Sequence, residues 1–156
     1  YFLGLQRTMS ERQKIHLHSD RYYRLMFETF RQHNMVELAI AEFDGEPVAI
    51  NEIIRHGSTG TFLHGGSTDA HKEVMAPALL QWETMKHLKA AGAEWYDFRG
   101  IAPADQPNHH LAGVTRFKMG FGGTERVYPS AGNKILQPTW YWAYRTAKRM
   151  RGGQSD

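Results

Sequence analysis

The spacing of hydrophobic residues predicts two helices at the start of the chain. Over residues 1–13, Leu5 and Met9 recur at helical intervals on one face. Ser19 or Asp20 suits the N-cap of a second helix, because a short polar side chain there can accept a backbone N–H. The aromatic stripe of this second helix consists of Tyr23, Phe27 and Phe30.

Residues 36–66 alternate between hydrophobic and polar positions in steps of two, which is typical of β-strands. Asp44-Gly45 marks a hairpin turn, and Ser58-Thr59-Gly60 marks a second one. The positions on one side of the first strand are Val36, Leu38 and Ile40. We therefore expect a three-stranded antiparallel meander.

A longer helix follows and leads into a fourth strand. Pro77 fits a first helical turn, and Gly92 stands where a C-terminal cap belongs. The predicted apolar face is Ala78, Trp82, Met85 and Leu88, which places Trp82 in the core. The predicted solvent face is Glu83, Lys86 and Lys89. Residues 94–98 form the next strand, which we expect beside the third meander strand.

The last third of the chain predicts a loop over 99–110, a short helix ending in the glycine turn of "TRFKMGFGG", a strand over 124–130 and a closing helix over 138–150. The resulting order, α-α-β-β-β-α-β-α-β-α, resembles that of the GNAT acyltransferase fold. We therefore expect an α/β (α+β) protein whose mixed, mostly antiparallel sheet is flanked by helices. The 156 residues suit one domain, with no internal repeat or linker.

Composition excludes several classes of protein. The absence of cysteine excludes disulfide frameworks and thiolate zinc sites, and no His/Asp/Glu cluster has metal-ligand spacing. No apolar run approaches the ~20 residues that cross a bilayer, and no signal peptide is visible. We therefore expect a cytoplasmic protein, with peripheral binding at the inner membrane face as a further option. Because the chain does not begin with Met, we expect it to be a piece of a longer protein.

The C-terminal segment is basic and aromatic. Residues 133–151 contain five basic residues and no acidic one, with Trp140, Trp142 and Tyr144 interleaved. One interpretation is a solvated helix face. Another is a surface that meets phosphates of nucleic acid or of a membrane. The interpretation that we favour for the aromatic residues is a docking surface for an absent domain or a second copy.

The loop before the long helix argues against coenzyme A. GNAT acetyltransferases present a glycine-rich loop to the pyrophosphate of the coenzyme at a helix N-terminus. Here no glycine follows Gly66 before the helix, and Asp69 and Glu73 stand where the anion would lie. Carboxylates repel a pyrophosphate, so the order of elements indicates an acyltransferase whereas the loop disfavours a coenzyme A donor.

Three stretches together carry a more specific resemblance. "FLHGGST", "MAPALLQWETMKHLKAAGAEWYDFRGI" and "VTRFKMGFGG" resemble the second GNAT-like domain of the Fem (FemABX) family, and the likeness extends over about residues 1–128. Such enzymes move an amino acid from aminoacyl-tRNA to the peptide stem of a nucleotide- or lipid-linked peptidoglycan precursor, which builds the interpeptide bridge. The resemblance implies no cofactor and no metal. Since the family has two such domains, it also implies that residues 1–156 are the C-terminal half of a two-domain protein.

The resemblance assigns roles to individual residues. Lys118 is expected to stabilise the tetrahedral oxyanion of ester aminolysis, and Phe117 to shape the pocket beside it. Arg116 is expected to contact a phosphate or to pair with a carboxylate. The remaining residues expected to contact substrate are Tyr22, Tyr23, His64, Ser67 and Asp97. At His64 the family tends to have an aromatic residue.

The attacking amine must lose a proton, and the base stays open at this point. Asp97, His109 and His110 are local candidates, and a group in the absent domain or on the substrate is another. Asp97 also suits a structural hydrogen bond at the end of its strand, and the histidine pair suits a polar loop.

Two other functions remain open beside aminoacyl transfer. One is a GNAT-like N-acyltransferase that acts on a small amine. The other is a non-catalytic module that binds a cell-wall peptide or RNA. Binding of acetyl-CoA would indicate the first, and binding without turnover would indicate the second.

Overall fold

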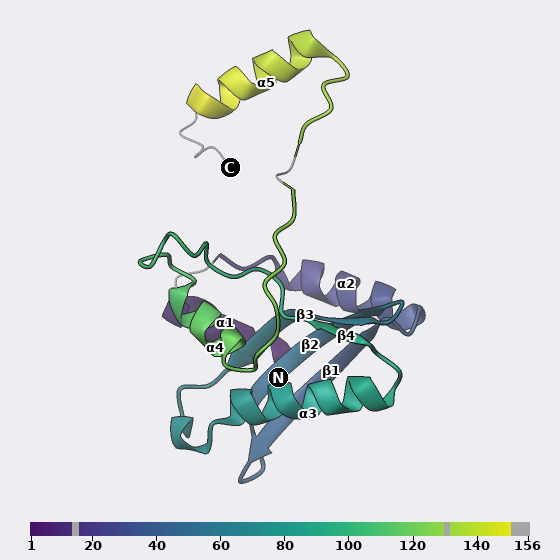
Figure 1. The fold of residues 1–156 in the computed structure, drawn as a ribbon, viewed down its shortest axis with the longest axis vertical. Coiled ribbons are helices and arrows are strands. Elements are labelled where there is room, and N and C mark those ends of the chain that lie inside the picture. Colours follow the sequence, from purple (N-terminus) through teal and green to yellow (C-terminus); the bar gives the residue numbers. More distant parts are fainter. Residues whose placement is uncertain (14–15, 130–131, 151–156) are drawn as a thin grey trace. The chain divides into compact units, whose positions relative to one another are not determined.

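The computed structural model describes residues 1–13, 16–129 and 132–150. The chain divides into two compact units, Tyr1–Phe121 and Gly122–Asp156, and each is described by itself. The first unit contains the sheet and the helices that cover it (Figure 1).

Four strands form one mixed sheet in the order β1-β2-β3-β4. The bounds of the strands are β1 Val36–Phe43, β2 Glu46–His56, β3 Thr59–Ser67 and β4 Trp95–Asp97. The three meander strands are antiparallel, and β4 pairs parallel with β3. This confirms the meander and the expected place of the fourth strand.

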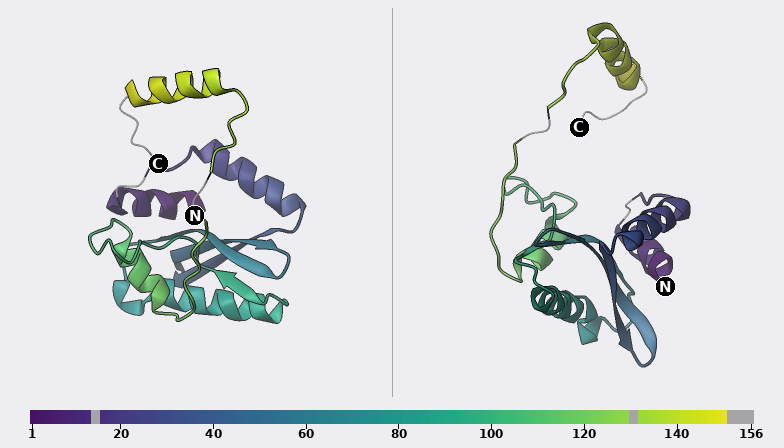
Figure 2. Two further views of the ribbon diagram at one scale, coloured as in Figure 1. Left: turned by 45° about the horizontal axis from the view of Figure 1, so that its top comes forward. Right: turned by 90° about the vertical axis from the view of Figure 1, so that its right-hand side faces the viewer.

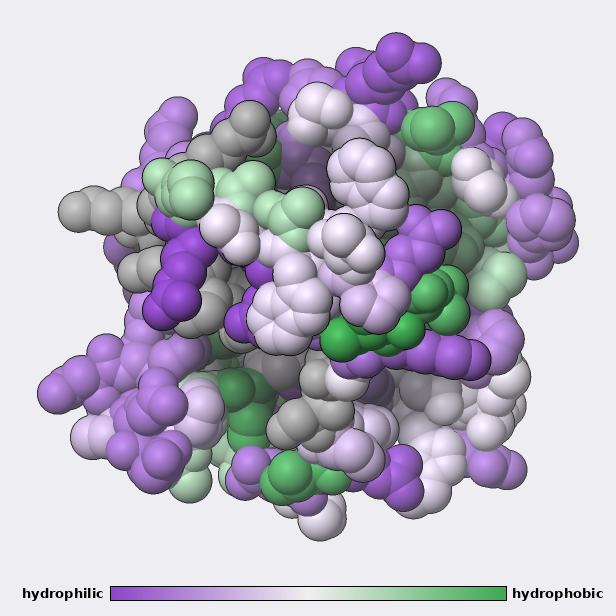
Figure 3. Space-filling view, turned by 90° about the horizontal axis from the view of Figure 1, so that it is seen from above, coloured by the Kyte–Doolittle hydropathy of each residue, from purple (hydrophilic) through white to green (hydrophobic). Residues whose placement is uncertain are grey.

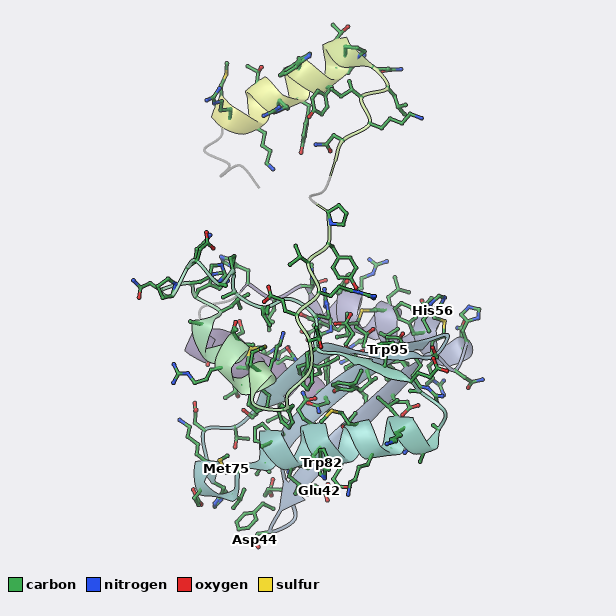
Figure 4. All side chains as sticks on the ribbon, viewed as in Figure 1. Glu42, Asp44, His56, Met75, Trp82 and Trp95 are labelled. Carbon is green, nitrogen blue, oxygen red and sulfur yellow. The ribbon has the colours of Figure 1, made fainter. Side chains whose placement is uncertain are left out.

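The two hairpins differ in how well their positions agree with the prediction. Asp44 and Gly45 adopt φ values of 52° and 82°, the backbone that a tight two-residue hairpin needs. The second turn lies at Gly57 and Ser58, one residue earlier than expected, so Thr59 and Gly60 belong to β3. Gly57 takes the positive φ of 57° that this turn requires, and glycine adopts it without steric cost. Figure 4 shows Asp44 and His56 at opposite ends of β2.

Helices cover both faces of the sheet. The helices of the first unit are α1 Phe2–Gln13, α2 Asp20–Gln32, α3 Ala76–Ala90 and α4 Ala112–Met119, and a 3₁₀ turn, η1 Lys72–Val74, precedes α3. In the right-hand view of Figure 2, α1 and α2 lie on one face, whereas α3 and α4 lie on the other. Of the two N-cap candidates, Ser19 and Asp20, Ser19 is the N-cap of α2 and accepts the backbone N–H of Tyr22.

The core lies mainly between the sheet and α3. Its central cluster is Val48, Ala49, Ala76 and Leu80, with Ala39, Ala41 and Phe43 packed against it. Burying such side chains stabilises the fold by roughly 1.5–3 kcal/mol for each large aliphatic residue. The opposite side of β1 keeps Leu38 and Ile40 partly exposed to solvent.

The expectation that Trp82 lies in the core is wrong. Its side chain is 55% exposed and projects from α3 (Figure 4). The buried residues of α3 are Ala76, Leu80, Gln81, Thr84 and Leu88. Gln81 and Thr84 occupy the buried face because both have partners there, Tyr96 Oη at 2.5 Å and Leu80 O at 2.6 Å. Because these polar residues are hydrogen-bonded in the interior, the pattern of apolar residues did not reveal which face of α3 is buried.

The pairing of β3 with β4 is short. Only Thr59 to Thr61 pair with Trp95 to Asp97, so the rest of β3 has no paired strand on that side among the described residues. This separation of the strands opens the edge of β3 from Phe62 to Ser67.

The second unit contains one helix among its described residues, α5 Pro138–Met150, which confirms the closing helix. The strand expected over 124–130 is wrong for residues 124–129, which form no ladder; residue 130 lies outside the described residues. No helix in the described parts of the chain is long and apolar enough to cross a membrane. In the space-filling view, hydrophobic residues form small groups among hydrophilic ones (Figure 3).

Candidate active site

A cavity of about 570 Å³ lies along the open edge of β3. Residues from α1, β2, β3, α3 and α4 line it, and two predicted catalytic residues, Phe117 and Lys118, are among them. His64 and Ser67, predicted to contact substrate, line it as well. The fold therefore brings four of the eight predicted site residues to one cavity.

Lys118 is buried, with 9% of its surface exposed. Its Nζ donates a hydrogen bond of 2.6 Å to the carbonyl oxygen of Gly100, in the loop after β4. Burial lowers the pKa of the Lys118 ammonium, and nearby Arg99 lowers it further, whereas Asp97 raises it. A buried ammonium on a cavity wall is an unusual place for lysine, because the residue is almost never fully buried unless paired.

The loop that receives Lys118 is held in a defined shape. The backbone N–H of Arg99 donates to Asp97 Oδ1 at 2.6 Å, and Arg99 adopts a φ of 61°. This bond at the end of β4 turns the chain so that the Gly100 carbonyl faces Lys118. Asp97 is exposed and is not among the residues that line the cavity, so its observed contact is the structural one.

A β-bulge shapes the cavity wall at β3. Glu52 pairs with His64, and Ile53 pairs with Phe62, so Leu63 is the extra residue between them. Its carbonyl oxygen accepts a hydrogen bond of 3.2 Å from the Arg99 guanidinium. Bulges re-aim neighbouring side chains, and this one sets the direction of His64.

Two glycines keep β3 close to its neighbours. A Cβ at Gly66 would lie 2.9 Å from the backbone of Leu5, so its absence lets α1 pack directly on the strand. A Cβ at Gly65 would meet the Phe62 ring at 2.4 Å. The small residues of "FLHGGST" therefore serve close packing at the cavity wall.

Phe117 belongs to an aromatic group behind the cavity. Its ring lies 5.3 Å from that of Phe121, which stacks at 5.4 Å on Phe98. Phe117 also lines a second cavity of about 280 Å³ at the start of α3. Phe117 therefore lines both cavities.

The loop over this second cavity carries ion pairs of its own. Lys72 Nζ lies 2.9 Å from Asp69, and His71 Nδ1 lies 3.3 Å from Glu73. Backbone hydrogen bonding lowers the pKa of the Glu73 carboxyl, so it stays ionised near the N-terminus of α3. The loop before α3 thus carries two ion-paired carboxylates, Asp69 and Glu73.

Sequence reasoning missed three buried polar residues at the centre of the unit. Gln6 and Asn51 line the main cavity, and neither amide nitrogen has a hydrogen-bond partner among the described residues. Glu52 is 0% exposed, and its Oε2 lies 2.9 Å from His64 Nδ1. A signal was present, since Asn51-Glu52 interrupts an otherwise apolar run in "PVAINEII".

The two tyrosines differ in their surroundings. Tyr23 is 5% exposed, and its ring packs edge-on against His64 at 5.2 Å. Burial raises the pKa of its hydroxyl. Tyr22 is 44% exposed and packs on His18 at 4.2 Å. Tyr23 is therefore the core residue of the pair, and Tyr22 is the exposed one.

The remaining candidates take different places. Arg116 is exposed on α4 and is not among the residues lining the cavity. His110 lines the cavity, whereas His109 accepts the backbone N–H of Leu111 at 3.1 Å. Among the three local base candidates, His110 alone reaches the cavity wall.

A family model for the FemAB family matches residues 46–149. This chain belongs to the FemAB family. Aminoacyltransferase FemB of Staphylococcus epidermidis is 28% identical over 92 residues, which cover 58% of this chain and 22% of that protein. Aminoacyltransferase FemA of the same organism is 25% identical over 142 residues, which cover 80% of this chain and 34% of that protein. The chain spans at most about a third of these curated relatives.

Solved structures agree on the fold. FemX superposes with a TM-score of 0.70 at 14% identity, over 75% of this chain and 46% of that one. Aminoglycoside antibiotic 6'-N-acetyltransferase AAC(6')-IG from Acinetobacter haemolyticus superposes with a TM-score of 0.55 at 14% identity, over 86% of this chain and 95% of that one. The FemAB domain described here therefore has the GNAT-like fold that its order of elements predicted.

Proposed function

We propose that this chain is the C-terminal GNAT-like domain of an aminoacyltransferase. The enzyme moves an amino acid from aminoacyl-tRNA to an amine on the peptide stem of a peptidoglycan precursor. One observation carries the proposal, which is the buried Lys118 on the cavity wall of a FemAB-family domain. The names of the FemA and FemB relatives support the reaction class.

The position of Lys118 suits the chemistry. When an amine attacks the ester carbonyl, negative charge develops on the carbonyl oxygen. A cation in a site poor in water stabilises this charge much more than a solvated one does. The Gly100 carbonyl holds Lys118 Nζ in place and has no charge to neutralise it. Phe117 completes the wall at this point.

The other substrate contacts follow from exposure and position. Arg116 is free to meet a phosphate of the tRNA or the precursor, because it is exposed on the same helix as Lys118. Tyr22 offers an exposed ring to the precursor. Ser67 lines both cavities. Asp97 acts through the loop that places Gly100.

The proposal extends to the whole protein. A second GNAT-like domain, N-terminal to this chain, or a second copy would complete the precursor groove. The protein would work in the cytoplasm, with peripheral binding at the inner membrane face when the precursor is lipid-linked.

The test is to measure transfer by the full-length protein from charged tRNA to a precursor peptide. We expect Lys118→Ala to lower kcat by roughly 10²–10³, with little change in the KM for the peptide. Lys118→Arg should restore little, because a planar fork does not replace a point charge. Lys89→Ala, which removes an exposed lysine of α3, is the matched control. Unchanged kcat in Lys118→Ala would remove this lysine from the mechanism.

A further inference from the structure

A buried carboxylate lies behind one wall residue of the cavity. Glu52 is in the middle of the central strand β2 and is 0% exposed. Its Oε2 lies 2.9 Å from His64 Nδ1, and its Oε1 has no hydrogen-bond partner among the described residues. Burying a carboxyl group costs free energy unless its polar atoms are paired, and His64 is the partner found for Glu52.

The imidazole of His64 is fixed in orientation. Tyr23 and Phe2 pack edge-on against it, with ring centroids at 5.2 Å and 6.5 Å. Because a carboxylate can only accept a hydrogen bond, an ionised Glu52 would place the proton of a neutral imidazole on Nδ1. Nε2 is then left with a free lone pair, and the His64 side chain remains 22% exposed on the cavity wall.

We propose that His64 is the proton acceptor for the attacking amine and that Glu52 is the residue that positions it. The inference rests on the proposed function and adds the base that this function requires. A histidine held by a buried carboxylate is an arrangement that activates weak nucleophiles in unrelated enzymes. Lys118 lines the same cavity and supplies the opposite charge that the oxyanion needs.

The step balances without another reactant. The amine nitrogen attacks the ester carbonyl carbon and forms a C–N bond, and His64 Nε2 takes one proton from that nitrogen. When the tetrahedral intermediate collapses, the bond from carbon to the ribose oxygen breaks. The proton on His64 passes to that oxygen, which leaves as the tRNA hydroxyl. Glu52 stabilises the imidazolium that forms in between.

Other titratable groups share the surroundings of His64. Tyr23 of α2 packs its ring against His64, and Lys118 of α4 and His110 of the loop before α4 line the same cavity. The pH dependence of transfer therefore reports on His64 together with these groups. Comparison of variants is needed to separate the contribution of His64 to this pH dependence from the contributions of the other groups.

The test compares variants of the full-length protein in single-turnover transfer. We expect His64→Gln to lower the rate roughly 10²–10⁴-fold, the usual contribution of a general base. Imidazole added to His64→Ala should restore part of this rate. His56→Gln, at the exposed end of β2, is the matched control. The inference would be overturned if His64→Gln transferred at the full rate. A loss of rate in His110→Gln alone would assign the role of base to His110 instead.

A second measurement needs no activity. Nitrogen NMR of isotope-labelled histidines should show that the neutral imidazole of His64 carries its proton on Nδ1. In Glu52→Gln the amide can donate to Nδ1, so the proton should move to Nε2 and the transfer rate should fall at least about tenfold. Observation of the Nε2–H form in the unmodified protein would refute the inference. The failure of the unmodified protein to transfer at all would instead refute the proposed function.

Discussion

At the scale of the residue, the burial of the Lys118 ammonium costs stability. Its ammonium is buried against a neutral carbonyl, so the folded chain holds the charge less well than water does. The lowered pKa expresses the same fact, because burial is its largest cause. Active-site groups commonly carry such a cost, since the arrangement is selected for catalysis.

We therefore predict that Lys118→Met raises the melting temperature by about 2–4 °C while it lowers kcat about as much as Lys118→Ala does. The unfolded chain binds the Lys118 proton up to the ordinary pKa of 10.5, whereas the folded chain releases it at lower pH. Stability of the unmodified protein should thus rise with pH within that window, and Lys118→Met should lack this contribution. Urea denaturation of both proteins at several pH values measures the difference. A lower melting temperature for Lys118→Met would show that the lysine stabilises the fold.

At the scale of the element, the close approach of α1 to β3 depends on one missing methyl group. We predict that Gly66→Ala destabilises the protein by about 1–3 kcal/mol, because its Cβ would lie 2.9 Å from the backbone of Leu5. Gly113→Ala in α4 is the matched control, since nothing lies within 4 Å of its Cβ. There alanine should be neutral or stabilising, because Gly113 lies in the first turn of α4 and no neighbouring atom has to move. Denaturant titration of both variants tests the pair, and equal effects would contradict the packing argument.

The loop before α3 carries charged residues that bear on which acyl carrier the domain accepts. We predict that acetyl-CoA does not bind appreciably, because Asp69 and Glu73 bring negative charge to the place of a pyrophosphate. Isothermal titration calorimetry of the chain with acetyl-CoA measures this. A micromolar dissociation constant would favour the N-acyltransferase alternative over aminoacyl transfer from tRNA.

At the scale of the whole molecule, the chain covers about a third of its FemA relative. We predict that residues 1–156 alone transfer little or no amino acid, because the family resemblance implies a precursor groove built from two domains. Trp140, Trp142 and Tyr144 of α5 are more than half exposed within the structure, and Arg145 lies over the Trp142 ring at 5.5 Å. Such a surface suits a docking role.

This last prediction compares the chain with a version extended at its N-terminus. Both are assayed with charged tRNA and a precursor peptide, and light scattering reports self-association of the shorter chain. Equal activity in the two would show that the single domain is a complete enzyme.

The sequence by itself determined most of the local structure. Alternation in steps of two predicted the three meander strands, and helical spacing predicted α1, α2, α3 and α4, because these periods follow directly from backbone geometry. Asp44-Gly45 predicted its turn, since both residues tolerate a positive φ. The role proposed for Lys118 came from the resemblance of "VTRFKMGFGG" to the Fem family, because no periodicity in the sequence singles out this lysine. The strand expected after it did not form over 124–129.

Only the tertiary structure decided which side chains are buried and which meet. Trp82 lies outside and Gln81 inside, because a partner on β4 satisfies the glutamine and no local pattern encodes that partner. Glu52 and His64 are twelve positions apart and meet only through the register and bulge of β2 and β3. Lys118 becomes a buried cation only because the loop after β4 presents the Gly100 carbonyl to it. Burial and long-range pairing depend on the whole fold, so one-dimensional periodicity cannot supply them.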